Sequence, residues 1–284
     1  MKISMTLTDH SWADGVAGMR RVAEIADAGG IDTIWLPDHL LQADPTSQPE
    51  AELFEAIGTL GYLAAVTNRA RLGLLVSPIT FRPPAVQVKA IATLDAFTGG
   101  RMWFGIGIGW EDAEAKAMGL PMGPVKERFE QLEELLEIAD LMFAGGSSPY
   151  AGKHFQLAGP ICSPHPETRP PVLIGGTGEQ KTLRLVAKYA DACNLFDIPD
   201  GGKTVRHKLA VLRERCDEVA RPYDAIEKTL ATRLGPTDTA DDLVRRCEEH
   251  AELGIDHDIF IRTGPWTPES TDLLTTVVGR LATS

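Results

Sequence analysis

The sequence predicts a (β/α)8 (TIM) barrel of eight parallel strands, each followed by a helix, with one insertion between the fourth and fifth strands. Short β-rich runs alternate with amphipathic helical stretches from one end of the chain to the other. Such strict alternation requires parallel strands joined by helical crossovers. The number of these units is eight, which closes a barrel, and the 284 residues suit a single domain over 1–284.

The strands are expected where short apolar runs, typical of buried parallel strands, lie between turn residues. These runs are 2–7, 32–36, 70–76, 101–107, 171–175, 191–196, 227–233 and 257–262. Helices are expected between them. In the first interval, apolar residues recur at helical spacing from Val16 to Ala26, and Gly29 and Gly30 follow as a C-cap.

The interval from 108 to 170 is longer than one helix requires, and it predicts the insertion. We expect a short helix near 112–118, the main helix over 124–143, and a hairpin from Tyr150 to Leu157 that turns at Gly152 and Lys153. An open doubly wound sheet is the alternative fold. It usually places a G-x-G-x-x-G turn after the first strand, where this chain has Thr8-Asp9-His10-Ser11.

Charge and cysteine usage exclude several classes of partner. The formal net charge of -12 argues against a nucleic-acid or anionic-membrane surface, because the field of the protein repels phosphate groups.

The four cysteines are far apart and form no C-x-x-C pair, which is typical of reduced thiols in a cytoplasmic protein. The N-terminus soon turns polar and no apolar run is long enough to span a bilayer, so we expect neither a signal peptide nor a membrane anchor.

Catalytic groups in a barrel come from the carboxyl ends of the strands and the loops that follow them. Asp38 and His39 directly follow the second strand, and a histidine can act as general acid or base near neutral pH. Asp9 after the first strand and Glu111 after the fourth are further candidate acids. The alternative is structural, with Asp38 capping the loop and His39 packing beside it.

Glycines alternate along the fourth strand at Gly105, Gly107 and Gly109 and are followed by Trp110. Because position 110 is not glycine, this is not a dinucleotide-binding fingerprint. Alternate glycines remove side chains from one face of a strand, so that a flat ring or another backbone can approach it, and Trp110 would then wall the pocket. The alternative is a tight barrel bend without space for side chains.

The fifth strand runs into Gly175, Gly176, Thr177 and Gly178 before the next helix. Backbone N–H groups at a helix N-terminus bind anions, and Thr177 adds a hydroxyl donor, so we predict a phosphate site here. The seven histidines show neither H-x-H nor H-E-x-x-H spacing, so no metal site is expected. The G-x-S-x-G turn of a serine hydrolase is also missing.

Three segments in the same order resemble the luciferase-like monooxygenase superfamily, specifically its F420-dependent oxidoreductase branch, over nearly the whole chain. They are GIDTIWLPDHL at 30–40, the segment 72–119 from LGLLVSP to AKAMG, and PPVLIGGTGEQKTLRLVAKYADACN at 170–194. The resemblance implies a homodimer and coenzyme F420 as the cofactor.

The resemblance also implies where the cofactor lies. His39 would sit against the deazaflavin ring and assist hydride or proton transfer. A bulge around Val76 and Ser77, often with a non-prolyl cis peptide, would back the ring, and Gly107, Gly109 and Trp110 would line the same slot. The turn Gly175–Thr177 would hold the phosphate. Sugar-phosphate dehydrogenases of this family carry an acid where this chain has Trp110, which weakens that assignment.

Three functional hypotheses follow. The leading one is hydride transfer between F420 and a small, fairly apolar organic substrate. The second is an FMN-dependent monooxygenase of the same superfamily. The third is a non-catalytic barrel that binds a cofactor, in which His39→Ala would leave every activity unchanged. We expect the insertion at 144–160 and the loop Thr263–Trp266 to shape the substrate pocket, because loops vary independently of the barrel.

Overall fold

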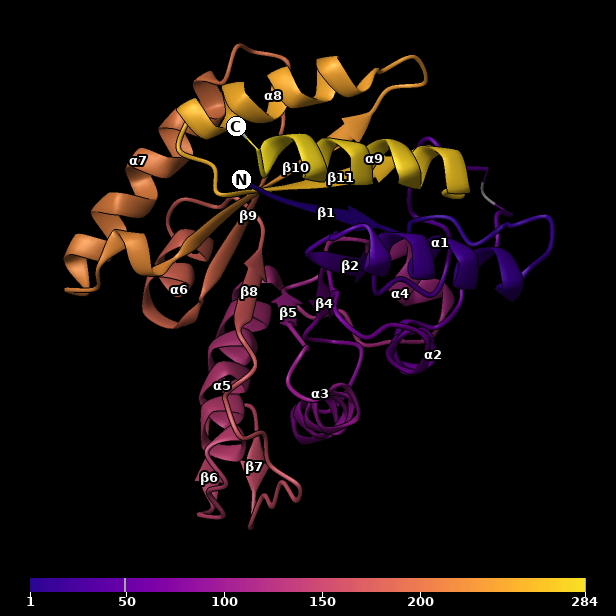
Figure 1. Cartoon of the computed structure of the whole chain (residues 1–284). Helices are drawn as coiled ribbons and strands as arrows, with labels where there is room; N and C mark the ends of the chain where they lie inside the picture. Colours follow the sequence, from indigo (N-terminus) through magenta and orange to yellow (C-terminus); the bar gives the residue numbers. More distant parts are fainter. Residues whose placement is uncertain (49, 284) are drawn as a thin grey trace.

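Nine parallel strands form the main sheet of the computed structural model, which describes residues 1–48 and 50–283 (Figure 1). They are β1 (Lys2–Thr6), β2 (Thr33–Leu36), β3 (Arg71–Leu74), β4 (Ser77–Pro78), β5 (Phe104–Gly107), β8 (Val172–Gly175), β9 (Ala192–Phe196), β10 (Glu227–Leu234) and β11 (His257–Arg262). β4 pairs with β5, and Leu72 of β3 forms a parallel bridge with Met102, just before β5. β3 and β4 therefore act as one strand, and the predicted eight-membered barrel is confirmed.

The third strand is divided by a bulge, so it is shorter than the predicted run 70–76. A cis peptide bond joins Leu75 to Val76 between β3 and β4, which is where the family resemblance implies a bulge. Gly105 of β5 gives this bulge its space. A Cβ atom added at Gly105 would lie 1.7 Å from the carbonyl oxygen of Leu74, so only glycine fits there.

Helices surround the barrel (Figure 1). They are α1 (Val16–Ala28), α2 (Ala56–Val66), α3 (Pro84–Thr98), α5 (Val125–Phe143), α6 (Thr182–Tyr189), α7 (Lys203–Glu218), α8 (Ala240–Glu252) and α9 (Pro268–Leu281), with a 3-10 turn, η1 (Tyr223–Ala225), before β10. As predicted, α1 ends at Gly29 as its C-cap. None of the helices in the described part of the chain is long and apolar enough to cross a membrane.

The insertion after β5 contains the elements that the sequence predicts. They are α4 (Asp112–Ala117), the long α5, and a hairpin of β6 (Tyr150–Ala151) and β7 (Gln156–Leu157). The hairpin lies beside α5 (Figure 1). The carboxylate of Glu134 on α5 accepts hydrogen bonds from the backbone N–H of Lys153 at 2.8 Å and of His154 at 3.0 Å. The hairpin is therefore held against α5 by Glu134.

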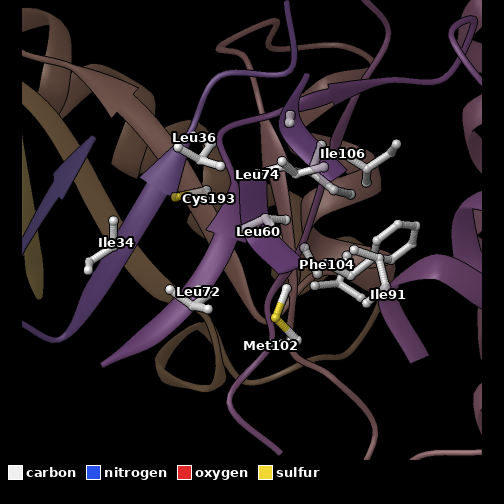
Figure 2. Packing of buried hydrophobic residues seen from close by; sticks show 14 of the residues in the cluster. Ile34, Leu36, Leu60, Leu72, Leu74, Ile91, Met102, Phe104, Ile106 and Cys193 are labelled. Carbon is white, nitrogen blue, oxygen red and sulfur yellow. The ribbon is translucent and has the colours of Figure 1, made fainter. Parts of the chain in front are cut away.

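The barrel strands are buried on both faces, and alternate residues belong to different layers. Ile34 and Leu36 of β2 pack in the layer between strands and helices, together with Leu60 of α2 (Figure 2). Trp35, between them, packs in the barrel interior against Trp103, with ring centroids 5.7 Å apart. This aromatic layer packs the described barrel interior below its mouth, so a ligand in the barrel would lie at the carboxyl ends of the strands.

The amino ends of the strands carry a polar cluster, which we call the base cluster: Ser4 and His257, which are buried, Glu227, which is partly buried, and Lys2, which is exposed. Ser4 Oγ lies 2.5 Å from Nε2 of His257, and Nδ1 of His257 lies 2.6 Å from Oε1 of Glu227. Burial alone would raise the pKa of Glu227, but the hydrogen bond and charge of His257, together with Lys2 at 2.7 Å, outweigh burial and lower it to about 2.

Candidate functional site

A cavity of about 460 Å³ opens at the carboxyl ends of the barrel strands. All eight strands of the ring contribute to its wall through residues of their carboxyl halves or residues that follow. These include Thr6 and Thr8, Pro37 and His39, Leu75 and Val76, Gly107 and Ile108, Gly175 and Gly176, Asn194 and Phe196, Ala231, and Ile261. Its size and mostly apolar wall are typical of a site for a small molecule or a cofactor ring.

The floor of the cavity is built around the bulge between β3 and β4. The side chain of Val76 packs over Gly107 and Gly175. A Cβ atom added at either glycine would lie 2.9 Å or 2.8 Å from Cγ2 of Val76. The alternating glycines of the fourth strand thus make space for the bulge as well as for a ligand. The close approach of Leu74 and Val76 explains Gly105 and Gly107, which agrees with the tight-bend alternative, and Gly107 and Gly109 also line the cavity.

His39 lines the cavity and is held there by Glu114 of α4. Nδ1 of His39 lies 2.6 Å from Oε2 of Glu114. Because a carboxylate only accepts hydrogen bonds, Nδ1 is the donor. Neutral His39 then carries its lone pair on Nε2, the nitrogen that remains for a bound molecule. The side chain of His39 is 16% exposed, so this nitrogen is accessible from the cavity.

Glu114 is the anchor of the loop after β2. Besides His39, its carboxylate accepts hydrogen bonds from the backbone N–H of Leu40 at 2.5 Å and of Leu41 at 2.9 Å. Burial alone would raise the pKa of Glu114, but these hydrogen bonds, together with the charge of His39 when that ring is protonated, outweigh burial and lower it. Glu114 is therefore ionised at neutral pH. The edge of Trp110 contacts His39 at 5.6 Å between ring centroids.

Asp38 does not line the cavity. It is fully buried, and its carboxylate accepts hydrogen bonds from Ser77 Oγ at 2.5 Å and from Nη2 of Arg82 at 2.9 Å. Ser77 also lies outside the lining, beneath the bulge. Arg82 in turn donates to Glu55, the N-cap residue of α2, at 2.6 Å. The structure thus places Asp38 in an anchoring network behind His39 rather than beside a ligand.

The other two candidate acids differ in position. Asp9 is buried outside the cavity wall, and its carboxylate accepts a hydrogen bond from the backbone N–H of Ser11 at 2.9 Å. Glu111 does line the cavity, but its carboxylate caps α4 by accepting from Ala113 N at 3.2 Å. The acid that the structure joins to His39 is Glu114, three residues further along the same segment.

The predicted phosphate turn lies at the edge of the cavity. Gly175 and Gly176 line it, and Thr177, half-buried, follows just outside the wall. Gly176 has a φ of 107°, which favours glycine because a side chain would be strained there. The backbone then enters α6 at Thr182. A phosphate bound at this turn would meet backbone N–H groups and the Thr177 hydroxyl.

Neither of the two loops expected to shape the substrate pocket contributes a described residue to the cavity wall. The insertion at 144–160 packs along α5, and its hairpin contributes no lining residue. Trp266, in the loop after β11, is buried, and its Nε1 donates to the carbonyl of Thr6 at 2.8 Å. The wall at the mouth is made instead by Phe81, Trp110 and Met122.

The charge of the cavity restricts its ligands. Among the described residues that line it, none is lysine or arginine. His39 is the titratable base, and Glu111 and Glu114 are the acids of the wall. An anionic group in this cavity would lack a basic partner and would meet two carboxylates. The cavity therefore suits uncharged molecules, and an anion suits only its edge at the Gly175–Gly176 turn.

Comparison with known proteins identifies relatives over most of the chain. The family model described as luciferase-like monooxygenase matches residues 1–269. An F420-dependent glucose-6-phosphate dehydrogenase of Microbacterium testaceum is 28% identical over 211 residues, which are 74% of this chain and 61% of the relative. A pyrimidine monooxygenase of Variovorax paradoxus is 26% identical over 74% of this chain and 56% of its own. The chain thus spans about three fifths of the length of such relatives.

Solved structures share the fold at low identity. An F420-dependent secondary alcohol dehydrogenase, in complex with an F420-acetone adduct, superposes with a TM-score of 0.83 and 16% identity, covering 98% of this chain and 99% of that one. A long-chain alkane monooxygenase superposes equally well, at 0.83 and 14% identity, covering 100% of this chain and 91% of that one. At these identities the likeness supports the barrel fold alone.

Proposed function

Because the chain belongs to the luciferase-like monooxygenase family, we propose that it is an oxidoreductase that transfers a hydride between coenzyme F420 and a small, uncharged organic substrate. One observation carries this proposal. A histidine oriented by an ionised glutamate faces an apolar cavity at the barrel mouth. That arrangement is suited to moving a proton to or from a neutral substrate while a hydride is transferred.

The residues present fit a deazaflavin. The floor formed by Val76 and Leu75 is apolar and carries no polar side chain that a flat ring would leave unpaired. Gly175, Gly176 and Thr177 would hold the phosphate, and Gly107 and Gly109 would give the ring close backbone contact. When bound, F420 supplies the acceptor or donor of the hydride.

His39 moves the proton in this proposal. Its Nδ1–H is held by Glu114, so Nε2 accepts the proton of a substrate hydroxyl as the hydride leaves the carbon, and returns it in the reverse direction. The carboxylate of Glu114 stabilises the resulting imidazolium and keeps the ring in place. Phe81, Met122 and Phe196 add apolar surface to the wall around the reacting atoms.

The charge of the cavity separates this chain from one group of its relatives. Glucose 6-phosphate carries a dianionic group that needs basic partners, and the described lining residues include neither lysine nor arginine. A secondary alcohol or ketone has one polar atom and needs one acid or base. We therefore expect short secondary alcohols to be used in preference to sugar phosphates.

An FMN-dependent monooxygenase is the second candidate. The pyrimidine monooxygenase of Variovorax paradoxus is 26% identical over 74% of this chain, the same share that the F420-dependent relative of Microbacterium testaceum covers. FMN and F420 share a flat tricyclic ring and a phosphate, so the cavity and the glycine turn suit both. His39 favours F420, since proton transfer to a substrate oxygen accompanies hydride transfer.

Cofactor titration tests the proposal. The purified protein is titrated separately with F420 and with FMN, followed by cofactor fluorescence and by thermal shift. The same titrations are repeated with Gly176→Val and with Gly201→Val as the matched control. Both glycines have positive φ, at 107° and 72°, so both variants carry backbone strain, but only Gly176 lines the cavity.

The expected result is F420 binding that Gly176→Val weakens and Gly201→Val does not, followed by F420-linked oxidation of short secondary alcohols. A preference for FMN would favour the monooxygenase. Binding of neither cofactor would overturn both candidates.

A further inference from the structure

Two buried polar side chains project into the cavity from β1 and β9. Thr6 of β1 and Asn194 of β9 are 2% and 3% exposed, and both line the cavity. Side chains alternate between the two faces of a strand. Met5 and Cys193, which precede them, pack in the layer between strands and helices, so Thr6 and Asn194 point into the barrel.

Both side chains retain hydrogen-bonding groups that no described residue pairs. Oδ1 of Asn194 accepts from Oγ1 of Thr229 at 2.8 Å, which leaves the NH2 group of Asn194 without an acceptor in the described part of the chain. The hydroxyl of Thr6 has no hydrogen-bond partner there either. Neither group is enclosed on all sides by protein atoms, so a molecule in the cavity can reach both. Because buried polar groups are nearly always hydrogen-bonded, these two are suited to pair with a ligand.

The positions of these groups separate them from the side where the proposed cofactor ring fits. The glycines that would give a flat ring close contact lie at the ends of β5 and β8. The next strands in the sheet are β9, β10, β11 and β1, and they line the cavity with Asn194, Ala231, Ile261 and Thr6. His39 follows β2, the neighbour of β1. A substrate that reaches His39 beside the ring therefore extends along the side from β1 to β9.

We propose that Thr6 and Asn194 bind a second oxygen atom of the substrate, apart from the oxygen that exchanges its proton with His39. This inference rests on the proposed function and narrows its substrates to neutral alcohols and ketones with a further carbonyl or hydroxyl group, such as hydroxy ketones. An amide NH2 group donates hydrogen bonds and a hydroxyl both donates and accepts, so a neutral oxygen acceptor suits both. A carboxylate would share the cavity with Glu111 and Glu114, and the described lining residues include no lysine or arginine to pair with it.

This arrangement makes Thr6 and Asn194 determinants of specificity rather than catalytic residues. A substrate without the second oxygen displaces water from the two groups and leaves them unpaired, and this penalty disfavours it. Sites that hydrogen-bond a polar group discriminate strongly against analogues that lack the group. We therefore expect a hydroxy ketone to be preferred over the plain alcohol of the same chain length by about 10-fold or more in kcat/KM.

The experiment compares kcat/KM for F420-linked oxidation within matched pairs of substrates. The pairs are 3-hydroxybutan-2-one with butan-2-ol, and 5-hydroxyhexan-2-one with hexan-2-ol. In each compound the carbinol carbon gives its hydride to F420 and its hydroxyl proton to His39, which leaves a ketone.

Four variants are compared with the wild type. Asn194→Leu and Thr6→Val remove the polar groups, and Thr6→Ser keeps the hydroxyl. Thr59→Val is the matched control, because Thr59 is a buried residue of α2 outside the cavity wall, and its hydroxyl donates to the carbonyl of Glu55 at 2.8 Å. Circular dichroism verifies that each variant is folded.

Two further measurements need no turnover. The affinity of each variant for F420 is measured by cofactor fluorescence. Binding of butane-2,3-dione and of butan-2-one is compared by thermal shift, because a ligand that binds the folded protein raises its melting temperature. The comparison is made with oxidised F420, which has no hydride to transfer, and again without cofactor.

We expect the wild type, Thr6→Ser and Thr59→Val to prefer the hydroxy ketone of each pair and to bind the dione more tightly than butan-2-one. Asn194→Leu and Thr6→Val should each lose most of that preference and retain their affinity for F420. Equal values within the pairs in the wild type, or a preference that survives in both of these variants, would overturn the inference. So would a loss of F420 affinity, because the two residues would then contact the cofactor. A wild type that does not bind F420 would instead contradict the proposed function, and dione binding to the cofactor-free protein would still decide the inference.

Discussion

The two ends of the barrel contain the same pair of residues in different settings. At the mouth, Nδ1 of His39 lies 2.6 Å from Glu114, and at the base, Nδ1 of His257 lies 2.6 Å from Glu227. Both glutamates have a lowered pKa. The difference lies in the second ring nitrogen. Nε2 of His39 faces the cavity, whereas Nε2 of His257 is occupied by Ser4 Oγ at 2.5 Å.

This difference shows that a catalytic arrangement requires access as well as geometry. Ser4, His257 and Glu227 stand in the order of a serine hydrolase triad, with hydrogen-bond distances that suit one. Ser4 and His257 are fully buried, however, and Ser4 Oγ also accepts from the backbone N–H of Thr33 at 3.0 Å. The base cluster is therefore satisfied internally and stabilises the barrel, while the mouth pair retains a nitrogen for a ligand.

Replacing His39 and His257 should give the two largest effects. The first replacement should lower activity, and the second should lower stability. His39→Ala is expected to lower kcat by about 10² to 10⁴, the usual contribution of a general acid or base, with little change in thermal stability. His257→Ala is expected to lower the melting temperature and to leave kcat of the folded protein unchanged. Steady-state kinetics with F420 and a secondary alcohol, alongside thermal melts, measure both. Unchanged activity in His39→Ala would indicate a barrel that only binds its cofactor.

Removing the charge of Glu114 should have the next largest effect. Glu114→Gln keeps the size of the side chain but no longer stabilises the imidazolium, so we expect kcat to fall by about 10 to 100-fold, the loss usual when a carboxylate that orients a metal-ligating histidine is replaced. F420 affinity should not change. Glu111→Gln is the matched control, because Glu111 lines the same cavity and only caps α4. Equal losses in both variants would contradict a specific role for Glu114.

The sequence predicts the barrel well because strand and helix patterns are local. The alternation of short apolar runs with amphipathic stretches establishes eight strands, the hairpin and the insertion helices. The break in the third strand follows from contacts between distant residues. Gly105 makes space for the carbonyl of Leu74, and no local pattern in 70–76 shows that the strand bends there. The family resemblance, rather than periodicity, pointed to it.

The site was predicted only in part for a similar reason. His39 and the glycines of the wall follow directly from their positions at strand ends. The partner of His39 is separated from it by 75 residues, and three acids, Glu111, Asp112 and Glu114, lie close together in the sequence. Which of them faces His39 depends on how α4 packs over the loop after β2. That Asp38 pairs with Arg82 likewise depends on the packing of segments that are distant in the sequence.

At the base, deleting one partner should reduce stability rather than activity. Glu227→Ala leaves the buried Nδ1–H of His257 without an acceptor, so we expect the free energy of unfolding to fall by about 1–3 kcal/mol. Denaturant unfolding followed by circular dichroism measures this change. Glu24→Ala is the control, since Glu24 makes an exposed ion pair with Arg20 on α1 and surface pairs contribute little. An equal loss in the control would argue against a stabilising base cluster.

The smallest expected effect is a change in how the melting temperature depends on pH, and it should appear only at acidic pH. In the folded protein the pKa of Glu227 falls from its ordinary value of 4.5 to about 2. Its ionised form therefore stabilises the fold above pH 4.5, and this contribution is lost as the pH falls from 4.5 toward 2. Glu227→Gln cannot lose a charge, so its melting temperature should fall less steeply than that of the wild type across this window. Parallel slopes would mean that other carboxylates dominate acid unfolding and that Glu227 contributes little to it.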